Sequence, residues 1–180
     1  IGAAAYIVVN PRNGNVLLAR NAHTRRQVAS TQKLLTALTV MDAGGLDRQV
    51  TVAASDTYVE PVKMGIKPGE KYSKRHLLEA MVVRSSNDIA KCLARTTGGS
   101  EARFVQMMNA RARRMGMQNT NFRNAHGLTE SGAYSTAFDL AILGTHVLNS
   151  AYLHRLTRTR EMVFTKASGA QVQPTATAWL

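Results

Sequence analysis

The sequence predicts a mixed α/β fold of the α+β kind, in which an N-terminal antiparallel hairpin joins a cluster of helices around one central buried helix. The hairpin is indicated by two β-rich apolar runs on either side of Asn13-Gly14, a residue pair typical of two-residue hairpin turns. The central helix is indicated by residues 31–43, which are apolar almost all round and therefore suited to burial. Further helical runs, each bounded by glycine or a capping residue, begin at residue 74.

Length and composition narrow the class of protein. With 180 residues the chain has the length of one domain, and we expect residues 1–180 to form it. Apolar residues make up 44% and charged residues 19%, which fits a soluble globular protein and argues against disorder. No uninterrupted apolar stretch approaches the roughly 20 residues that cross a bilayer. Because the first residue is Ile1 and not Met, we expect a processed or excised chain whose signal peptide, if any, has been removed.

The formal net charge of +12 is high for this size, and arginines cluster in two places. The clusters are Arg103, Arg111, Arg113 and Arg114, and then Arg155, Arg158 and Arg160. Such a surface either attracts polyanions, such as nucleic acid, anionic lipid head groups or an acidic cell-wall polymer, or is simply a solvated face. No zinc-finger spacing, aromatic-glycine RNA signature or arginine-rich tail is present, so nucleic acid is not predicted as a partner.

Local signals place the elements of the N-terminal half. Strands are expected over residues 4–9 and 16–19, on either side of the turn. The helix over 31–43 ends at Gly44-Gly45, and Ser30 stands at its entrance. The following excursion, residues 46–73, is irregular, with an extended piece at 50–53 and a turn at 67–70.

The C-terminal half is mainly helical. Helices are expected over residues 74–83 and 87–97, with a break at Ser85-Ser86-Asn87. Ser100 caps the next helix, which Gly116 ends, and Thr136 with Asp139 forms a capping box for a helix that reaches Asn149. The tail is expected to be extended over residues 161–164 and 171–175.

Ser30 and Lys33 supply the most specific chemistry. Residues three apart on a helix share one face, with Cβ atoms about 5–6 Å apart, so the amine of Lys33 can reach the hydroxyl of Ser30. To act as a base, the amine must be neutral near pH 7, so its pKa must fall by about 3 units, at a cost of roughly 4 kcal/mol. A Ser-x-x-Lys pattern occurs by chance about once in a chain of this length. Its position before the most buried helix nevertheless favours an acyl-transferring enzyme with a serine nucleophile and a lysine base.

Ser85-Ser86-Asn87 has two compatible interpretations. The three residues end one helix and cap the next, as serine and asparagine commonly do. They can also act in catalysis, with the Ser85 hydroxyl as a proton relay and Asn87 holding Lys33 and the substrate amide by hydrogen bonds. The five histidines show no zinc-ligand spacing, and no Gly-x-Ser-x-Gly elbow, Walker loop or Rossmann fingerprint is present.

Four segments extend the pattern beyond these two motifs. They are AAAYIVVNPRNGNVLLARNA, ASTQKLLTALTVMDAG, IKPGEKYSKRHLLEAMVVRSSNDIAKCLA and MNARARRMGMQNTNFRNAHGLTESGAYSTAFDLAIL. In this order they resemble the low-molecular-weight penicillin-binding proteins, specifically the D-alanyl-D-alanine carboxypeptidase family, over nearly the whole chain. The resemblance implies a β-lactamase/transpeptidase-like fold.

The resemblance also implies roles for individual residues. Ser30 matches the acylated serine and Lys33 the general base, while Ser85 and Asn87 match the first and third members of the second motif. Ser86 stands where this branch usually has glycine. The third motif, Lys-Thr-Gly, has no match, and the chain corresponds to roughly the first two-thirds of the catalytic domain. We therefore expect a sheet that is incomplete at the C-terminus and a chain that is truncated, completed by another chain or inactive alone.

The implied reaction removes the terminal D-alanine from peptidoglycan stem peptides through an acyl-enzyme on Ser30, without a metal or organic cofactor. β-Lactam antibiotics are expected to acylate the same serine. The family works outside the cytoplasmic membrane, so a periplasmic or other extracytoplasmic, envelope-associated location is expected, where the charge would suit an anionic wall or membrane surface. A D,D-endopeptidase, a class A-type β-lactamase and an inactive wall-binding or scaffold form stay open as alternatives. Against the β-lactamase, we find no convincing acidic loop motif.

Overall fold

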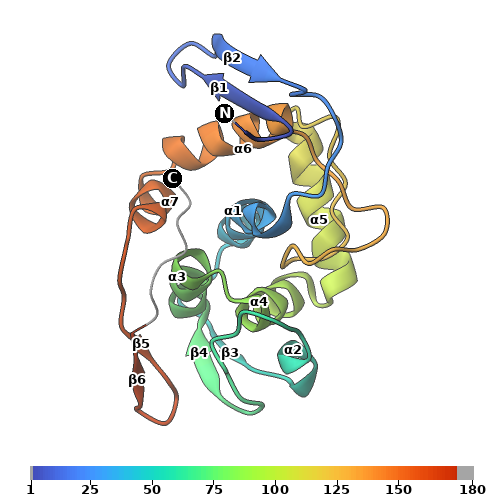
Figure 1. Cartoon of the computed structure of the whole chain (residues 1–180). Helices are drawn as coiled ribbons and strands as arrows, with labels where there is room; N and C mark the ends of the chain where they lie inside the picture. Colours follow the sequence, from blue (N-terminus) through green and yellow to red (C-terminus); the bar gives the residue numbers. More distant parts are fainter. Residues whose placement is uncertain (1, 174–180) are drawn as a thin grey trace.

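The computed structural model describes residues 2–173, which form short strands and a cluster of helices (Figure 1). The strands are β1 (Tyr6–Val9), β2 (Val16–Arg20), β3 (Gln49–Thr51), β4 (Lys71–Ser73), β5 (Phe164–Thr165) and β6 (Gln171–Val172). The helices are the 3₁₀ turn η1 (Ala29–Gln32), α1 (Lys33–Ala43), α2 (Ala54–Thr57), α3 (Lys74–Arg84), α4 (Asn87–Gly98), α5 (Glu101–Arg114), α6 (Ala137–Asn149) and α7 (Ala151–Thr157).

The N-terminal hairpin forms as predicted, but its turn is longer than two residues. Strands β1 and β2 pair antiparallel, and Asn13-Gly14 lies in the turn between them. The N–H of Asn10 donates to the carbonyl of Asn15 at 2.8 Å, so the turn covers the residues between these two. Pro11 explains the difference, because it has no N–H to donate to the ladder and the strand pairing stops before it.

Helix α1 is the centre of the fold, as the apolar pattern predicted. It lies in the middle of the molecule and contacts α3, α4, α5 and α6, which surround it (Figure 1). Most of its side chains are buried, including Leu35, Ala37, Leu38 and Val40. The helix begins later than expected, because residues from Ala29 to Gln32 form the tighter 3₁₀ turn η1, which contains Ser30.

Helices α3 and α4 form a helical hairpin that breaks at the predicted place. The backbone of Ser85 is left-handed, with φ +60°, and its N–H donates to the carbonyl of Met81 at 2.8 Å. This conformation ends α3 and turns the chain back, so that α4 starts two residues later at Asn87. The break thus lies between two helices that both pack on α1.

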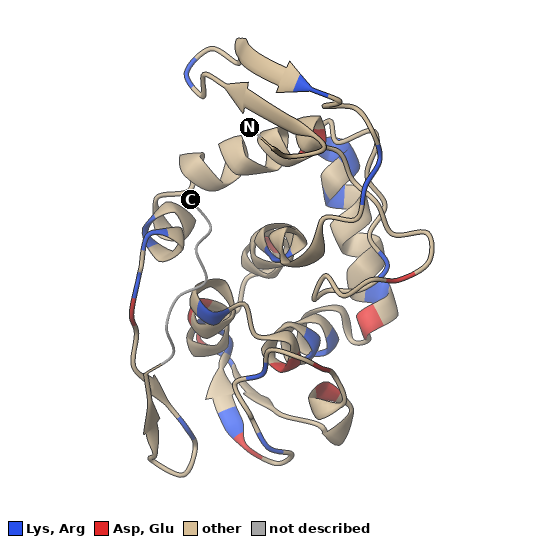
Figure 2. Cartoon of the chain, in the orientation of Figure 1, with Lys and Arg blue, Asp and Glu red and all other residues tan. Residues whose placement is uncertain are grey.

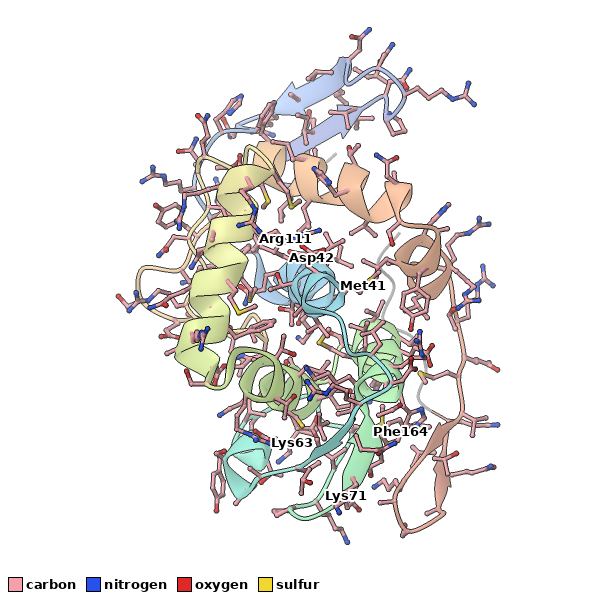
Figure 3. All side chains as sticks on the ribbon, turned by 180° about the vertical axis from the view of Figure 1, so that it is seen from behind. Met41, Asp42, Lys63, Lys71, Arg111 and Phe164 are labelled. Carbon is pink, nitrogen blue, oxygen red and sulfur yellow. The ribbon has the colours of Figure 1, made fainter. Side chains whose placement is uncertain are left out.

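The remaining helices confirm the predicted N-caps Ser100 and Thr136 and add two short elements. The expected capping box is incomplete, because the Asp139 carboxylate accepts hydrogen bonds from Asn119 and Thr120 instead. The hydroxyl of Ser100 accepts the N–H of Arg103 at the start of α5, and that of Thr136 accepts the N–H of Asp139 at the start of α6. An ion pair between Asp42 and Arg111 joins the end of α1 to α5, and the two side chains point toward each other in Figure 3. Helices α2 and α7 were not predicted, because they have only four and seven residues and carry little periodic signal.

Three separate two-stranded sheets are present among the described residues: β1–β2, β3–β4 and β5–β6. The sheets are small and incomplete, as expected. Phe164, labelled in Figure 3, is buried against His76 and Tyr72, with ring centroids 4.5 and 5.4 Å away. This contact fixes the first part of the extended tail on α3, whereas part of the expected extended segment 171–175 lies outside the described residues.

The basic residues spread over many elements. Figure 2 shows Lys and Arg on α5, α7, strands β2 and β4 and several loops, with fewer Asp and Glu between them. Within residues 2–173, no helix has both the length and the apolar character needed to span a bilayer.

Candidate active site

Ser30 and Lys33 meet at the start of the central helix. The Nζ atom of Lys33 lies 2.9 Å from the Oγ atom of Ser30, a hydrogen-bond distance. Lys33 is only 1% exposed, although lysine is almost never fully buried without a partner. Its ammonium or amine group also donates to the carbonyl oxygen of His126 at 2.5 Å. The structure therefore holds a buried nitrogen between a hydroxyl and a backbone carbonyl, with no carboxylate paired to it among the described ion pairs.

Burial changes the protonation of this lysine. Removal from water disfavours the charged form and lowers the pKa of Lys33 from 10.5 to about 7. A substantial fraction of the side chain is then a neutral amine at pH 7, which can accept a proton. The lowering of the Lys33 pKa agrees with the fall of about 3 units that a lysine base requires near pH 7, and its cause is burial. The pKa of His126 is lowered to about 4, by burial first and then by the positive charges of Lys33 and Lys91, so its ring is neutral at pH 7.

A loop far along the chain holds the carbonyl of His126 in place. The side-chain amide of Gln32, next to Lys33, donates to the backbone oxygen of Asn124 at 2.7 Å and to its Oδ1 atom at 3.0 Å. The same Oδ1 atom accepts the N–H groups of His126 and Gly127, at 3.2 and 2.8 Å. One asparagine side chain therefore shapes the loop and ties it to η1.

Gly127 brings this loop into direct contact with the Ser30 backbone. Its φ is +91°, a conformation that side chains with a Cβ rarely adopt. A Cβ at this position would lie 2.2 Å from the carbonyl oxygen of Ala29 and 3.0 Å from the Cα of Ser30. Only glycine allows this approach, so the position of Ser30 depends on residue 127.

Ser85, Ser86 and Asn87 are buried at the break between α3 and α4. None of the three side-chain oxygens Ser85 Oγ, Ser86 Oγ and Asn87 Oδ1 has a hydrogen-bond partner among the described residues. A buried polar group without a partner costs about 1–3 kcal/mol, so three adjacent ones point to a functional reason for retaining them. The strained backbone of Ser85 is a further sign of this kind.

The hydrogen bond expected between Asn87 and Lys33 is absent. The Oδ1 atom of Asn87 accepts nothing, and the contacts of Lys33 go to Ser30 and His126 instead. Instead of Asn87, the carbonyl of His126 accepts the hydrogen bond from Lys33. The structure thus joins Ser30 and Lys33 directly. Ser85 and Asn87 lie at the break between two helices that pack on α1, and no described hydrogen bond links them to the first pair.

The break itself is held by Asp88. Its carboxylate is fully buried and accepts the backbone N–H groups of Met64 and Gly65 at 3.0 and 2.8 Å. The N–H of Asn87 donates to the carbonyl of Val62 at 2.8 Å. Residues 62–66 are therefore fixed along the start of α4, which holds Ser85 and Asn87 rigidly.

His126 has a neighbour of its own in Glu101, the first residue of α5. The Nδ1 atom of His126 accepts the N–H of Leu128 at 3.2 Å, so the proton of the neutral ring is on Nε2. That atom faces the Oε1 atom of Glu101 at 3.8 Å, and this buried oxygen has no hydrogen bond within the described part of the chain. The pair brings the loop next to the start of α5.

The sequence interpretation did not assign roles to Gln32, Asn124, His126 or Gly127. The sequence points to the Asn-Ala-His-Gly-Leu stretch only as part of the family resemblance. Every residue has a backbone carbonyl, so the residue type does not reveal that the His126 carbonyl contacts Lys33. The two residues are also 93 positions apart in the sequence. The one available signal was glycine beside a polar loop, which indicates a close backbone approach. For metals, no cluster of three or more His, Cys, Asp or Glu groups exists in residues 2–173.

The chain is similar to several known proteins. A family model described as D-alanyl-D-alanine carboxypeptidase matches residues 1–179. The chain is 34% identical to the D-alanyl-D-alanine carboxypeptidase DacF of Bacillus subtilis over 167 residues, covering 88% of this chain and 42% of the relative. A crystal structure of D-alanyl-D-alanine carboxypeptidase from Mycobacterium tuberculosis superposes with a TM-score of 0.91 at 30% identity, covering 97% of this chain and 66% of that one.

A second solved structure, penicillin binding protein 5 from Haemophilus influenzae, superposes with a TM-score of 0.89 at 27% identity. It covers 98% of this chain and 52% of the other chain. These matches establish the predicted penicillin-binding, transpeptidase-like fold. The chain spans well under half the length of the Bacillus relative and about two-thirds of the Mycobacterium structure.

Proposed function

The chain belongs to the D-alanyl-D-alanine carboxypeptidase family, and we propose that it is a serine D,D-carboxypeptidase that cleaves the terminal D-alanine from peptidoglycan stem peptides. The observation that carries the proposal is the 2.9 Å contact between the buried Nζ atom of Lys33 and the Oγ atom of Ser30. Lysine can serve as the base because burial lowers its pKa to about 7. Residues 1–180 form part of the catalytic domain in this proposal.

Acylation begins with proton transfer from Ser30 to Lys33. The neutral amine takes the hydroxyl proton as Oγ attacks the carbonyl carbon between the two D-alanines, and a tetrahedral intermediate forms. The C–N bond then breaks, and the amine of the leaving D-alanine receives a proton from Lys33 through the Ser85 hydroxyl. The products are free D-alanine and an ester on Ser30. Water hydrolyses the ester in the second step, which restores the serine.

The surrounding residues position these groups. The His126 carbonyl accepts one hydrogen bond from Lys33 and so directs the nitrogen lone pair or the remaining proton toward Ser30. Ser85 relays protons, and Asn87 binds the substrate amide, because its unpaired buried oxygen is available for a new donor. The reaction requires no metal or organic cofactor, since each proton transfer has a side chain to perform it.

β-Lactams carry a reactive amide that can acylate the same serine, so we infer that they are inhibitors of this site. From the proposed substrate class we infer that the protein works outside the cytoplasmic membrane, in the periplasm or cell envelope. The formal charge of +12 supports an additional contact with an anionic membrane or wall surface.

Covalent labelling with a fluorescent penicillin tests the proposal. The wild-type chain is expected to form an adduct that mass spectrometry maps to Ser30, and Ser30→Ala should abolish it. Ser131→Ala is the matched control, because it removes an exposed hydroxyl from a loop outside the site and should label normally. An adduct on another residue would refute the assignment of Ser30. No adduct in a folded wild-type chain would instead support an inactive scaffold form.

A further inference from the structure

The α3–α4 hairpin has a second polar end, opposite to its break. Lys74 is the first residue of α3, and Ser85 follows the last. Eleven helical residues with a rise of 1.5 Å each separate the two by roughly 16 Å. Because α4 runs back along α3, its C-terminal residues return to the level of Lys74, where Thr97 accepts a hydrogen bond from the Lys74 Nζ atom at 3.3 Å. This open end is therefore well separated from the Ser30 site.

Backbone hydrogen bonds bring a second cation to Lys74. The N–H of Lys74 donates to the carbonyl of Arg48 at 3.0 Å, and the N–H of Arg75 donates to that of Leu46 at 2.7 Å. The segment before β3 is thus laid across the first turn of α3. The aliphatic part of Arg48 passes over Gly45, where a Cβ would lie 2.8 Å from its Cδ atom. The backbone of Arg48 is therefore held beside Lys74, while its exposed side chain lies over Gly45.

Arg48 and Lys74 have no carboxylate partner among the described ion pairs, whereas the neighbouring arginines do. Arg75 pairs with Asp47 at 2.9 Å, and Arg95 pairs with Asp56 at 2.7 Å. No described ion pair includes Arg48 or Lys74. Lys74 is also only 6% exposed, so its charge is held in place at a cost in desolvation. The charge of Arg48 acts in the same direction as burial, and both lower the pKa of Lys74.

Arg48 and Lys74 both line an open surface groove of about 470 Å³. It is lined by residues of β3, by the start of α3 and by the end of α4, including Arg48, Lys74, Arg95 and Thr96. No acidic side chain lines it. A volume of this size is within the range of small-molecule sites, so the groove admits a ligand larger than a single ion.

We propose that this groove binds a phosphate monoester, with the phosphate group held between Arg48 and Lys74. A phosphate monoester carries a charge of about −1.5 to −2 at pH 7, which matches the two unpaired cations. Arginine offers a planar fork of donors to phosphate oxygens, and lysine adds a compact point charge. The partial negative charge at the C-terminal end of α4 compensates part of the Lys74 charge, but Arg48 has no counterion. The groove is distinct from the catalytic site, and its function does not depend on that of Ser30.

An NMR titration at constant ionic strength tests this site. Glycerol 3-phosphate should shift the backbone amide signals of Lys74, Thr97 and Gly99 in a saturable way. Arg48→Gln and Lys74→Met should each raise the Kd tenfold or more, since a hydrogen bond to a charged group contributes about 1.5–3 kcal/mol. Methionine keeps the length and the apolar stem of the buried lysine, so the fold is retained. Arg12→Gln removes the same charge from the distant β1–β2 turn and should leave the Kd unchanged.

A second experiment distinguishes a lipid phosphate from a soluble phosphate ester. The protein is sedimented with vesicles that contain phosphatidic acid and with pure phosphatidylcholine vesicles. Co-sedimentation with the phosphatidic acid vesicles alone, weakened by Lys74→Met, would identify a lipid phosphate. Binding to glycerol 3-phosphate alone would identify a soluble ester. Absence of a saturable shift in the wild type, or equal Kd values in the wild type and both groove variants, would overturn the proposal. Lys74→Met should still be labelled by penicillin, so failure here is separable from failure of the proposed catalytic function.

Discussion

Lys33 combines two properties that seldom occur together, a buried nitrogen and the absence of a carboxylate partner. Arginine could not replace it, because a guanidinium stays protonated at all pH values that proteins tolerate. The Ser30 hydroxyl accepts a hydrogen bond from the ammonium form and can donate one to the neutral amine, while the His126 carbonyl accepts a hydrogen bond from either form. The site therefore tolerates either protonation state, as a base that gains and loses a proton must.

The rate of acylation should depend on pH through this residue. With a pKa of about 7, the neutral fraction of Lys33 falls about tenfold for each pH unit below that value. We expect the rate of acylation by a penicillin to rise from pH 5 to pH 7 and then to level off. His126, with a pKa of about 4, is neutral throughout and should add no second step. Stopped-flow or quenched labelling measures the profile.

Lys33→Arg is the control for this profile. It should lower the acylation rate about 10²–10⁴-fold, which is the usual contribution of a general base. A wild-type rate that does not vary between pH 5 and 8, or a nearly normal rate for the arginine variant, would show that another group removes the serine proton.

The loop around residues 124–128 contributes to the positions of Ser30 and Lys33. It contacts η1 through Gln32 and approaches Ser30 through Gly127. The predicted elements depended on signals within a few residues, such as Asn13-Gly14, Ser100 and Thr136. The loop's role depends on partners about 90 residues away, and it was therefore not predictable from local patterns.

Gly127→Ala tests the role of this loop. The added methyl group would collide with the Ala29 carbonyl and would require a left-handed backbone, so we expect a loss of about 2–4 kcal/mol in unfolding free energy and much slower acylation. Gly132→Ala is the matched control. Gly132 also has a positive φ, +79°, but nothing lies within 4 Å of its Cβ position. It should lose only about 1 kcal/mol and acylate normally. Normal acylation by Gly127→Ala would mean that the contact does not position Ser30.

Across the whole molecule, the elements that formed as predicted are those with a clear apolar pattern and a clear capping residue. The central helix, the break at Ser85 and the capped helices α5 and α6 were predicted, because apolar periodicity and glycine or serine boundaries coincide there. The short helix α7 follows α6 after a single residue, Ser150, so no loop signal separated them. The charge of Arg48 beside Lys74 was not predictable either, because backbone hydrogen bonds between distant segments create it.

Global stability should also depend on the protonation of Lys33. The unfolded lysine has a pKa near 10.5 and the folded one about 7, so between these values the unfolded state binds more protons. The unfolding free energy therefore rises with pH in this window and is lowest below pH 7. Relative to Lys33→Met, which lacks the titration, the wild type should gain about 3 kcal/mol from pH 7 to pH 10. Urea unfolding at several pH values measures the difference, and parallel curves for the two proteins would contradict the shift.

The protonation of one nitrogen underlies the catalytic proposal. Its direct measurement is an NMR titration of the folded protein labelled with ¹⁵N at lysine side chains, with Lys33→Met used to assign the Nζ signal. We expect this signal to titrate with a pKa of about 7, well apart from those of the exposed lysines. A value near the ordinary 10.5 would show that Lys33 is an ammonium ion at neutral pH, and it could not then deprotonate Ser30.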